Sequence, residues 1–302
     1  MTLAVYTTIY PAVESYLVDW YRSLRQQSDQ DFDLWIGLDG LDRDAVRKIL
    51  GSELEAKWVE APYGVTPAQI RQDALARIVE AYSEVVLVDS DDLLHPTRVA
   101  AARAGLESSQ LAGCALCLIN QRGESLGRTF GLPTHLAPED VFPRNNIFGF
   151  SNSAFRSELL RRCLPIPADA VLVDWFLATK AWLLGAKLSF DPVPRMDYRQ
   201  YLTNTARVLY PIAAGQIISD TARVRRHFQL VLAALSQEFL VDRVATLRMV
   251  AAEMEEFYKQ IVLQPARLED YTQAFNALHP ALLWWTTVAY PGLGYMWKPK
   301  KG

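Results

Sequence analysis

Short apolar runs alternate with amphipathic stretches along the first 110 residues of the chain. The apolar runs are rich in β-branched and aromatic side chains and predict four strands, at residues 3–9, 32–38, 56–60 and 84–89. Between them, apolar residues at helical spacing predict three helices, at about residues 16–24, 42–50 and 67–82. Thr66 is placed to cap the third helix, and Pro67 suits its first turn. This alternation predicts an α/β fold with a mostly parallel central sheet and helices on both faces.

The pattern after residue 110 is less regular and predicts shorter elements. Strands are expected at residues 114–120, 147–156 and 187–190, helices at 158–163 and 174–184, and a proline-containing loop at 129–143. A helical pattern with few glycines or prolines then covers residues 208–262. We therefore expect a first domain over residues 1–205 and a helical C-terminal region over residues 206–302, which ends in an aromatic and basic tail.

The composition narrows the classes of protein that fit this chain. Its 302 residues carry a net charge of −3, which argues against a protein that binds the backbone of nucleic acids. The sequence shows neither a secretory signal nor an apolar run long enough to span a membrane, and its three cysteines fit a reducing compartment, so a cytoplasmic location is expected. Cys114 and Cys117 lie in an apolar run with no histidine beside them, a pattern that favours packing over zinc binding or redox chemistry.

Polar residues follow the predicted strands at the points where ligands bind in such sheets, beyond the carboxyl ends of the strands. Thr8 and Tyr10 end the first strand, and Asp39 ends the second. Asp39 also precedes Gly40, so a plain turn is an alternative for it. The fourth strand ends in the acidic segment 89–92.

Three carboxylates, those of Asp89, Asp91 and Asp92, lie within four residues in that acidic segment. Like charges at such spacing repel one another, so the cluster is costly unless a cation neutralises it. Mg²⁺ and Mn²⁺ prefer oxygen ligands, typically one or two carboxylates together with the phosphates of a substrate. The segment therefore predicts a Mn²⁺ or Mg²⁺ site for a phosphorylated substrate. The alternative is a solvated acidic loop in which Asp92 caps the next turn.

The segment Asp89-Ser90-Asp91-Asp92, placed after an apolar strand, resembles the Asp-x-Asp motif of GT-A-fold glycosyltransferases of the family 2 type. The resemblance covers about residues 3–205 and includes the order of the neighbouring features, among them Thr8-Ile9-Tyr10, Asp39, the helix that carries Arg71 and the small-residue segment 149–156. It implies a Rossmann-like GT-A domain that binds a nucleotide-sugar, with a UDP-sugar as the expected donor.

The resemblance also implies roles for individual residues. Asp91 would bind the metal, and Asp89 would contact the ribose or share the metal. Thr8, Tyr10 and Asp39 would bind the nucleotide-sugar. Arg71 would face the diphosphate, although a surface ion pair with a nearby acidic residue, Asp73 or Glu80, is an alternative for it.

Asp174 opens a predicted helix and corresponds to the catalytic base of the family. A single base and a direct displacement imply inversion at the anomeric carbon. The alternative role of Asp174 is that of a first-turn acid favoured by the helix dipole. Trp175 is a candidate for stacking on an acceptor sugar, whereas Trp182 is expected to pack in the core. Tyr201 stands where the family carries a histidine, which leaves no third protein ligand assigned to the metal.

Two further features have alternative interpretations. His95 follows the acidic segment and is either a metal ligand or a plain loop residue. The aromatic tail over residues 282–301 either packs on its own domain or a second subunit, which is the favoured interpretation, or rests on a membrane surface.

Together these features predict a metal-dependent inverting glycosyltransferase that acts on a carbohydrate or glycolipid acceptor. The family resemblance places such an enzyme in cell-surface polysaccharide or glycolipid synthesis, in the cytoplasm or at the inner face of the membrane. The alternatives are a catalytically inactive nucleotide-sugar-binding protein and a metal-dependent nucleotidyltransferase or phosphatase. A nucleotidyltransferase would need a glycine-rich or basic loop near the N-terminus, and residues 7–11 offer none.

Overall fold

The computed structural model describes residues 2–51, 54–60, 62, 64–201 and 204–298. Within these ranges nine strands form one sheet, in the order β3-β2-β1-β4-β8-β6-β9-β5, with β7 paired to β6. The strands are β1 (Leu3–Ile9), β2 (Asp33–Leu38), β3 (Lys57–Glu60), β4 (Glu84–Leu87), β5 (Leu93–Leu94), β6 (Leu111–Ile119), β7 (Ser125–Phe130), β8 (Ser153–Arg156) and β9 (Leu188–Arg199).

The sheet is mostly parallel, as the alternating pattern predicts. The pairs β3–β2, β2–β1 and β1–β4 are parallel. Strands β6 and β9 run in the same direction as these four strands. The other three strands, β5, β7 and β8, run in the opposite direction. The carboxyl ends of β1, β2, β4, β6 and β9 therefore meet at one edge of the sheet. That edge is the place where an α/β sheet builds its ligand site.

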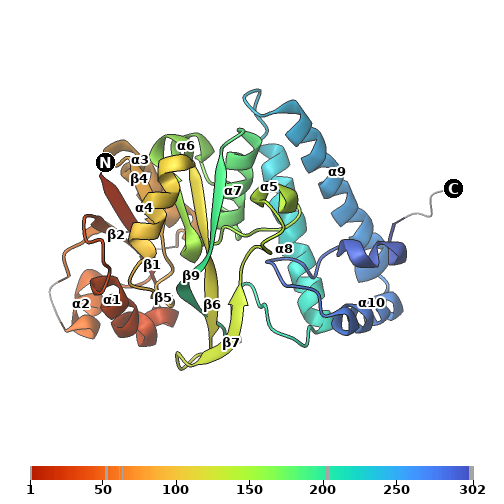
Figure 1. Ribbon diagram of the computed structural model, residues 1–302, viewed down its shortest axis with the longest axis horizontal. Coiled ribbons are helices and arrows are strands. Elements are labelled where there is room, and N and C mark those ends of the chain that lie inside the picture. Colours follow the sequence, from red (N-terminus) through yellow and green to blue (C-terminus); the bar gives the residue numbers. More distant parts are fainter. Residues whose placement is uncertain (1, 52–53, 61, 63, 202–203, 299–302) are drawn as a thin grey trace.

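Helices cover both faces of the sheet (Figure 1). The helices before residue 205 are α1 (Leu17–Arg25), α2 (Arg43–Leu50), α3 (Pro67–Ala81), α4 (Arg98–Ser108), α5 (Pro138–Val141), α6 (Ser157–Cys163) and α7 (Val173–Leu183). Helix α3 packs along β1 to β4, and α4 packs across β4, β6, β8 and β9. Thr66 and Gln69 form the capping box that starts α3, which confirms the cap expected at Thr66.

Several parts of the middle section differ from the sequence expectation. The loop expected at 129–143 includes the end of β7 and the short helix α5, neither of which was expected. The strand expected over 147–156 is divided, because Phe150–Asn152 forms a 3₁₀ turn before β8 begins. Strand β9 continues to Arg199, well beyond the expected 187–190. Its two prolines, Pro192 and Pro194, lie where the register with β6 shifts, and such a bulge lets a strand carry prolines that otherwise signal a loop.

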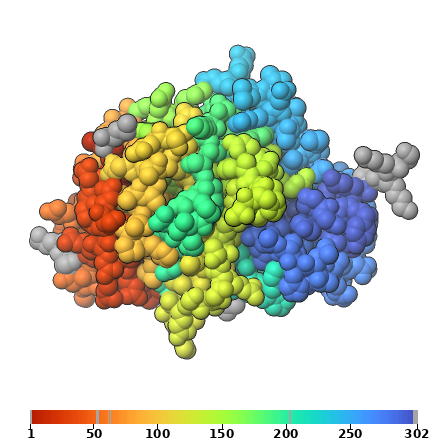
Figure 2. All heavy atoms as spheres, in the orientation of Figure 1, coloured from red at the N-terminus to blue at the C-terminus, as the bar shows by residue number. Residues whose placement is uncertain are grey.

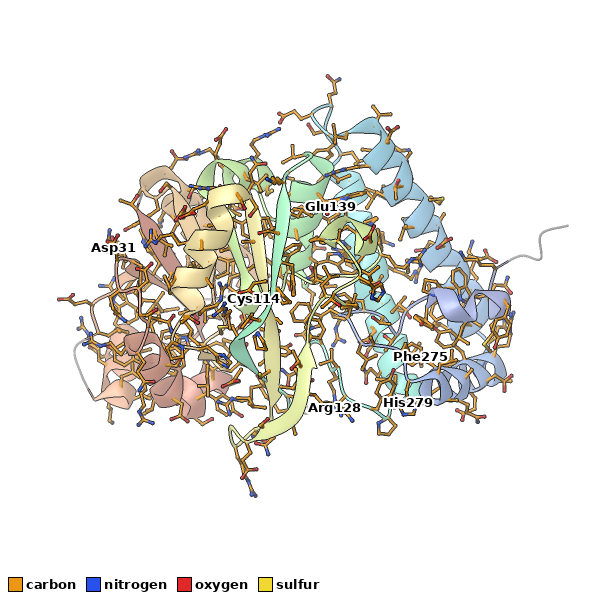
Figure 3. All side chains as sticks on the ribbon, viewed as in Figure 1. Asp31, Cys114, Arg128, Glu139, Phe275 and His279 are labelled. Atoms are coloured by element: carbon orange, nitrogen blue, oxygen red, sulfur yellow. The ribbon has the colours of Figure 1, made fainter. Side chains whose placement is uncertain are left out.

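Three long helices follow the sheet: α8 (Ala214–Ala233), α9 (Val241–Phe257) and α10 (Pro265–Leu278). In Figure 1 they lie on the side of β6 and β9 opposite to β1–β3. Helix α8 packs against α7 and so joins this region to the first part of the chain. Phe275, labelled on α10 in Figure 3, is fully buried and contacts the rings of Tyr271 and Tyr290. No helix in the described residues is both long and apolar enough to cross a membrane.

The aromatic tail returns from α10 to the first part of the chain and packs on it, as the favoured interpretation expects. In Figure 2 the blue C-terminal atoms lie against the yellow-green segment that precedes residue 150. Trp284 forms an isolated bridge with Asn146, and its ring lies 4.2 Å from that of Phe130. Because Trp284, Trp285 and Trp297 are buried, they cannot provide the interfacial aromatic surface considered for membrane contact. The basic residues Lys300 and Lys301 lie outside the described residues.

Candidate active site

The acidic segment lies at the carboxyl end of β4 and is held by hydrogen bonds from three other parts of the chain. Ser151 donates from Oγ to Asp92 and accepts from the backbone N–H of Asp89 at 3.0 Å. The backbone N–H of Arg199 donates to Asp92 Oδ1 over 2.8 Å. Ser90 Oγ donates to the carbonyl of Thr8 over 2.8 Å. Asp92 is fully buried and holds the turn together, so the alternative of a solvated acidic loop is wrong.

Asp89 and Asp91 line one cavity, and burial makes their negative charge costly. Burial raises the pKa of Asp89 to about 7, and the guanidinium of Arg71 only partly opposes this. Burial also raises the pKa of Asp91, although the hydrogen bond from Tyr201 lowers it in part. The pKa of Asp92 is raised by burial as well. Two carboxylates that line the same cavity, Asp91 buried and Asp89 half-buried, form a hard oxygen donor set. The residues present therefore fit a divalent cation of the Mg²⁺ or Mn²⁺ class.

Tyr201 contacts this donor set directly. Its hydroxyl donates to Asp91 Oδ2 over 2.6 Å, and its ring stacks on that of Tyr16 with the centroids 5.9 Å apart. A phenol at this point occupies one oxygen of Asp91, whereas a histidine would offer a nitrogen lone pair to a metal. The substitution seen in the sequence therefore leaves the site with carboxylate ligands alone among the described residues.

Arg71 reaches the cavity from α3. Its Nη2 lies 3.6 Å from Asp89 Oδ1, and its guanidinium lies over the ring of Phe150, 4.4 Å from the centroid. The alternative of a surface ion pair with Asp73 or Glu80 is wrong, since the ion-pair partner of Arg71 among the described residues is Asp89 and Glu80 bonds to Arg161 at 2.9 Å. Arg71 Nε is buried and has no hydrogen-bond partner among the described residues.

A second cavity adjoins the first and contains the other residues expected at the strand ends. Thr8, Tyr10 and Asp39 line it together with Arg71. Tyr10 and Arg71 also line the first cavity, so the two are continuous around them. The backbone N–H of Asp39 bonds to the carbonyl of Ile9 over 2.9 Å, which holds the ends of β1 and β2 side by side. The structure thus brings together Thr8, Tyr10, Asp39, Arg71, Asp89 and Asp91.

Asp174, in the first turn of α7, also lines the first cavity. Burial raises its pKa to about 6, opposed by the backbone N–H of Trp175 and by Arg71. Asn146 donates from Nδ2 to Asp174 Oδ2 over 3.1 Å. A half-buried carboxylate with this pKa is ionised at neutral pH and still basic enough to accept a proton.

The structure corrects the expectation that Trp175 stacks on an acceptor sugar. Trp175 is fully buried, and its ring stacks on His227 at 4.0 Å with an interplanar angle of 6°. On the other side Trp285 stacks on it at 6.2 Å, also at 6°. Trp285, not Trp175, lines the cavity. Trp175 therefore supports Trp285 from behind, because the helix turns its large ring into the core. Trp182 is a packing residue as expected, buried and stacked on Phe142.

Trp285 was not among the residues expected at the site, nor were Asn146 and Ser151. Trp285 has a positive φ of 73°, a conformation that bulky residues rarely adopt outside functional sites. The tail carries the dipeptide Trp284-Trp285, and this aromatic pair was the one sequence signal for its contribution. Asn146 and Ser151 lie in irregular segments with no distinguishing pattern.

His95 does not belong to this site. It is absent from the residues that line either cavity, and its Nε2 lies 2.8 Å from Asp197 Oδ1. Both ring nitrogens thus have partners outside the cavities, Nε2 at Asp197 and Nδ1 at the carbonyl of Pro194, although His95 follows Asp89 and Asp91 closely in the sequence. Direct ligation of the same metal by His95 is not compatible with this orientation.

Comparisons with known proteins were made for the sequence and for the fold. No family model matches the sequence, and no curated protein matches it. Among solved structures, TarS of S. aureus in complex with UDP-GlcNAc is similar with a TM-score of 0.56 and 17% identity, over 85% of this chain and 72% of that one. The mannosyltransferase PcManGT of Pyrobaculum calidifontis, in complex with GDP-Man and Mn²⁺, is similar with a TM-score of 0.59 and 16% identity, over 97% and 79%. The chain therefore shares the fold of these two proteins, which agrees with the GT-A fold expected from the sequence.

Proposed function

We propose that this protein is a metal-dependent glycosyltransferase that moves a sugar from a nucleotide-sugar to a hydroxyl acceptor with inversion at the anomeric carbon. One observation carries the proposal: Asp89, Asp91 and Asp174, from two separate parts of the chain, line the same cavity. The first two carboxylates provide a cation site, and the third provides a base. A sugar nucleotide needs both, since its leaving group is an anion and its acceptor must lose a proton.

The adjoining cavity is the proposed place of the nucleotide. Thr8, Tyr10 and Asp39 line it, and Arg71 stands at its border with the first cavity. A nucleoside there would direct its diphosphate toward Arg71, Asp89 and Asp91. The similarity to TarS with UDP-GlcNAc and to PcManGT with GDP-Man and Mn²⁺ supports a nucleotide-sugar donor and a divalent ion. We favour a UDP-sugar with Mn²⁺ or Mg²⁺.

The proposed reaction is a direct displacement. The acceptor oxygen forms a bond to C1 of the sugar, the bond from C1 to the phosphate oxygen breaks, and the diphosphate leaves with both electrons. Asp174 takes the proton of the acceptor hydroxyl, and Asn146 holds its carboxylate in place. Arg71 offsets negative charge on the diphosphate. When bound at Asp89 and Asp91, the metal neutralises the charge that builds on the leaving group. A single base on the acceptor side gives inversion.

The acceptor would occupy the space between Asp174 and Trp285. An indole face suits the apolar face of a sugar ring, and the stack of Trp285, Trp175 and His227 keeps that face fixed. We therefore propose a carbohydrate or glycolipid acceptor. In keeping with the resemblance to family 2, we place the reaction in cell-surface polysaccharide or glycolipid synthesis on the cytoplasmic side of a membrane. A homo-oligomer is compatible with this role, and no nucleic acid takes part.

Asp174→Asn tests the proposal most directly. The variant keeps the shape of the side chain and removes the base, so UDP-sugar binding should persist while turnover falls by orders of magnitude. Binding is first established by thermal shift with UDP-, GDP- and dTDP-sugars, with and without Mn²⁺, because a ligand of the native state raises the melting temperature. Asp220→Asn changes a buried acid on α8, outside the cavity, and serves as the matched control.

The outcomes separate the alternatives. Unchanged turnover in Asp174→Asn would remove Asp174 from the mechanism. Donor binding without any transfer or donor hydrolysis by the wild type would indicate an inactive nucleotide-sugar-binding protein. Release of free phosphate, or formation of a nucleotide-sugar from a nucleoside triphosphate, would indicate a phosphatase or a nucleotidyltransferase.

A further inference from the structure

A second group of potential metal ligands lies away from the proposed active site. His95, Cys117 and Asp197 each offer one ligand atom, and these three atoms all lie within 4.8 Å of one another. All three side chains are partly exposed, so an ion in solvent has access to them. Neither cavity of the active site includes any of the three. The group is therefore separate from the carboxylates Asp89 and Asp91.

The backbone of the sheet positions these ligands. Cys117 on β6 and Asp197 on β9 are direct partners in the register of the parallel pair, so their side chains stand next to each other on the same face. Leu93 of β5 pairs with Asp197 on the other side. The backbone N–H of His95 then bonds to the carbonyl of Arg195 over 3.0 Å. Cys117 and Asp197 thus lie on neighbouring strands, and His95, the residue directly after β5, is held beside them by its backbone hydrogen bond to β9.

The orientation of the His95 ring suits a metal ligand. Nδ1 lies 3.0 Å from the carbonyl oxygen of Pro194, which can only accept a hydrogen bond, so Nδ1 carries the hydrogen. Nε2 lies 2.8 Å from Asp197 Oδ1, and without a metal it donates a hydrogen to this carboxylate, so a cation would take the place of that hydrogen. Histidines that ligate metals commonly show this arrangement, in which the other ring nitrogen donates to a backbone carbonyl. A cation between Nε2 and the carboxylate would bond to both.

The mixture of donors indicates the kind of cation. Imidazole nitrogen, thiolate sulfur and carboxylate oxygen together suit Zn²⁺ and related ions, whereas Mg²⁺ and Mn²⁺ favour oxygen alone. Tetrahedral zinc places its ligand atoms roughly 3.3 to 3.6 Å apart, so the carboxylate must withdraw slightly from the ring. The sulfur already lies within 4.8 Å of both other ligand atoms. The thiol of Cys117 releases its proton when it ligates the ion.

We propose that His95, Cys117 and Asp197 form a binding site for Zn²⁺ or a similar transition-metal ion, with a fourth position open to water. The ion would join β5, β6 and β9 at one point of the sheet. Strand β9 also carries Arg199, whose backbone N–H holds Asp92 in the acidic turn. An ion at this site therefore stabilises the strands that support the proposed active site, and it takes no part in sugar transfer.

Cobalt provides the test, because a thiolate ligand gives Co²⁺ a sulfur-to-metal charge-transfer band that oxygen and nitrogen ligands do not give. The full-length protein is titrated with Co²⁺ in excess Mg²⁺, which occupies the oxygen site, and Zn²⁺ affinity is measured by displacement. Cys117→Ser should abolish the band and weaken Zn²⁺ binding by about 100-fold or more. Cys114→Ser is the matched control: Cys114 lies in the interior of the same strand, three residues away, and is labelled in Figure 3. It should leave the band unchanged.

Further variants keep the proposal testable if Cys117→Ser folds poorly. Asp197→Asn and His95→Gln should each retain the band at saturating Co²⁺ but shift its midpoint to higher metal concentration. Zn²⁺ should raise the melting temperature of the wild type and not that of Cys117→Ser. Absence of the band in the wild type, or its persistence in Cys117→Ser, would overturn the proposal. In that case His95 and Asp197 form only an ion pair.

Discussion

Asn146 donates from Nδ2 to Asp174 Oδ2 over 3.1 Å, and the backbone of the same residue forms a bridge with Trp284. Asn146 is fully buried, and its Oδ1 accepts from the backbone N–H of Phe148 over 3.0 Å, so the amide has a fixed orientation. One residue thus joins the proposed base, through its side chain, to the C-terminal tail, through its backbone. The tail is therefore part of the support of the site, although more than 100 residues separate Trp284 from Asp174 in the sequence.

The first prediction concerns the pH dependence of turnover. Burial raises the pKa of Asp174 to about 6, and only the ionised carboxylate accepts a proton. The fraction in the active form therefore falls as the pH falls through 6. We expect kcat/KM for the acceptor to decline about tenfold per pH unit below that value. Steady-state rates from pH 4.5 to 8 at saturating Mn²⁺ measure this, and a flat profile would contradict a role for Asp174 as the base.

In the variant Asn146→Ala, the decline of kcat/KM toward acidic pH should begin at a higher pH than in the wild type. The hydrogen bond from Asn146 stabilises the charged form of Asp174, so its loss raises the pKa of the carboxyl further and lowers the rate at pH 7. Asn145→Ala is the control, because Asn145 also bonds to the tail, from Nδ2 to the carbonyl of Trp284 at 3.3 Å, but does not contact Asp174. Equal shifts in both variants would assign the effect to the tail and not to the hydrogen bond.

Trp285→Ala should weaken acceptor binding and leave donor binding intact. The variant removes the indole that faces the cavity, and loss of one stacking contact is expected to raise the acceptor KM by about tenfold. Trp285→Phe should restore much of the affinity. Trp297→Phe is the matched control, since Trp297 is a buried tail residue packed on Phe257 outside the cavity. An unchanged acceptor KM in Trp285→Ala, measured with donor saturating, would show that the acceptor binds elsewhere.

Tyr201→His should tighten the binding of Mn²⁺. The phenol donates to Asp91 Oδ2 over 2.6 Å and supplies no ligand, whereas an imidazole at this point is shorter and offers a nitrogen lone pair beside Asp91. We expect the Kd for Mn²⁺ to be about tenfold lower in Tyr201→His than in the wild type, because the variant adds one nitrogen ligand whose position is not optimal. Tyr201→Phe removes the hydroxyl without adding a ligand and should show no such gain. Calorimetric titration with Mn²⁺ decides between the two, and equal affinity for both variants would contradict the assignment of Asp91 as a ligand.

The site residues at the strand ends could be predicted from the sequence, because the topology of a parallel sheet brings the ends of its strands together. Parallel strands end at the same edge of a sheet, so Thr8, Asp39 and Asp89 had to meet once each was placed at the end of its strand. Their hydrophobic runs are continuous, and each run ends in a polar residue that marks the edge. Arg71 follows from the same logic, since it lies in the first turns of the helix that enters from that edge.

The remaining parts of the site depend on contacts that no local pattern shows. Asn146 and Trp285 come from irregular segments, so neither periodicity nor spacing indicates where they lie. Trp175 and Asp174 are adjacent in the sequence, yet α7 directs one into the core and the other into the cavity. The sequence of α7 shows no separate polar and apolar faces, because nearly every residue of this helix is buried. Cys117 has no histidine beside it in the sequence, and only the pairing of β5, β6 and β9 brings His95 to it.

His227 gives a prediction about stability. It is fully buried against Trp175, and burial lowers its pKa to about 3, whereas the ordinary value near 6.5 applies to the unfolded chain. Between these values the unfolded state binds more protons than the folded state. The free energy of unfolding should therefore fall as the pH falls from about 6.5 toward 3, by up to about 1.4 kcal/mol per pH unit from this group.

His227→Phe keeps a planar ring on Trp175 and removes the titration, so it should reduce this pH dependence. Asp220 on the same helix acts in the opposite direction, because burial raises its pKa to about 6 and the folded state then binds its proton first. The comparison must therefore be the difference between wild type and His227→Phe, in which the contribution of Asp220 cancels. Urea unfolding at several values between pH 4 and 7.5 measures that difference. Parallel curves for the two proteins would mean that His227 accepts its proton in the folded state, and that the stack with Trp175 and Trp285 opens to water at mildly acidic pH.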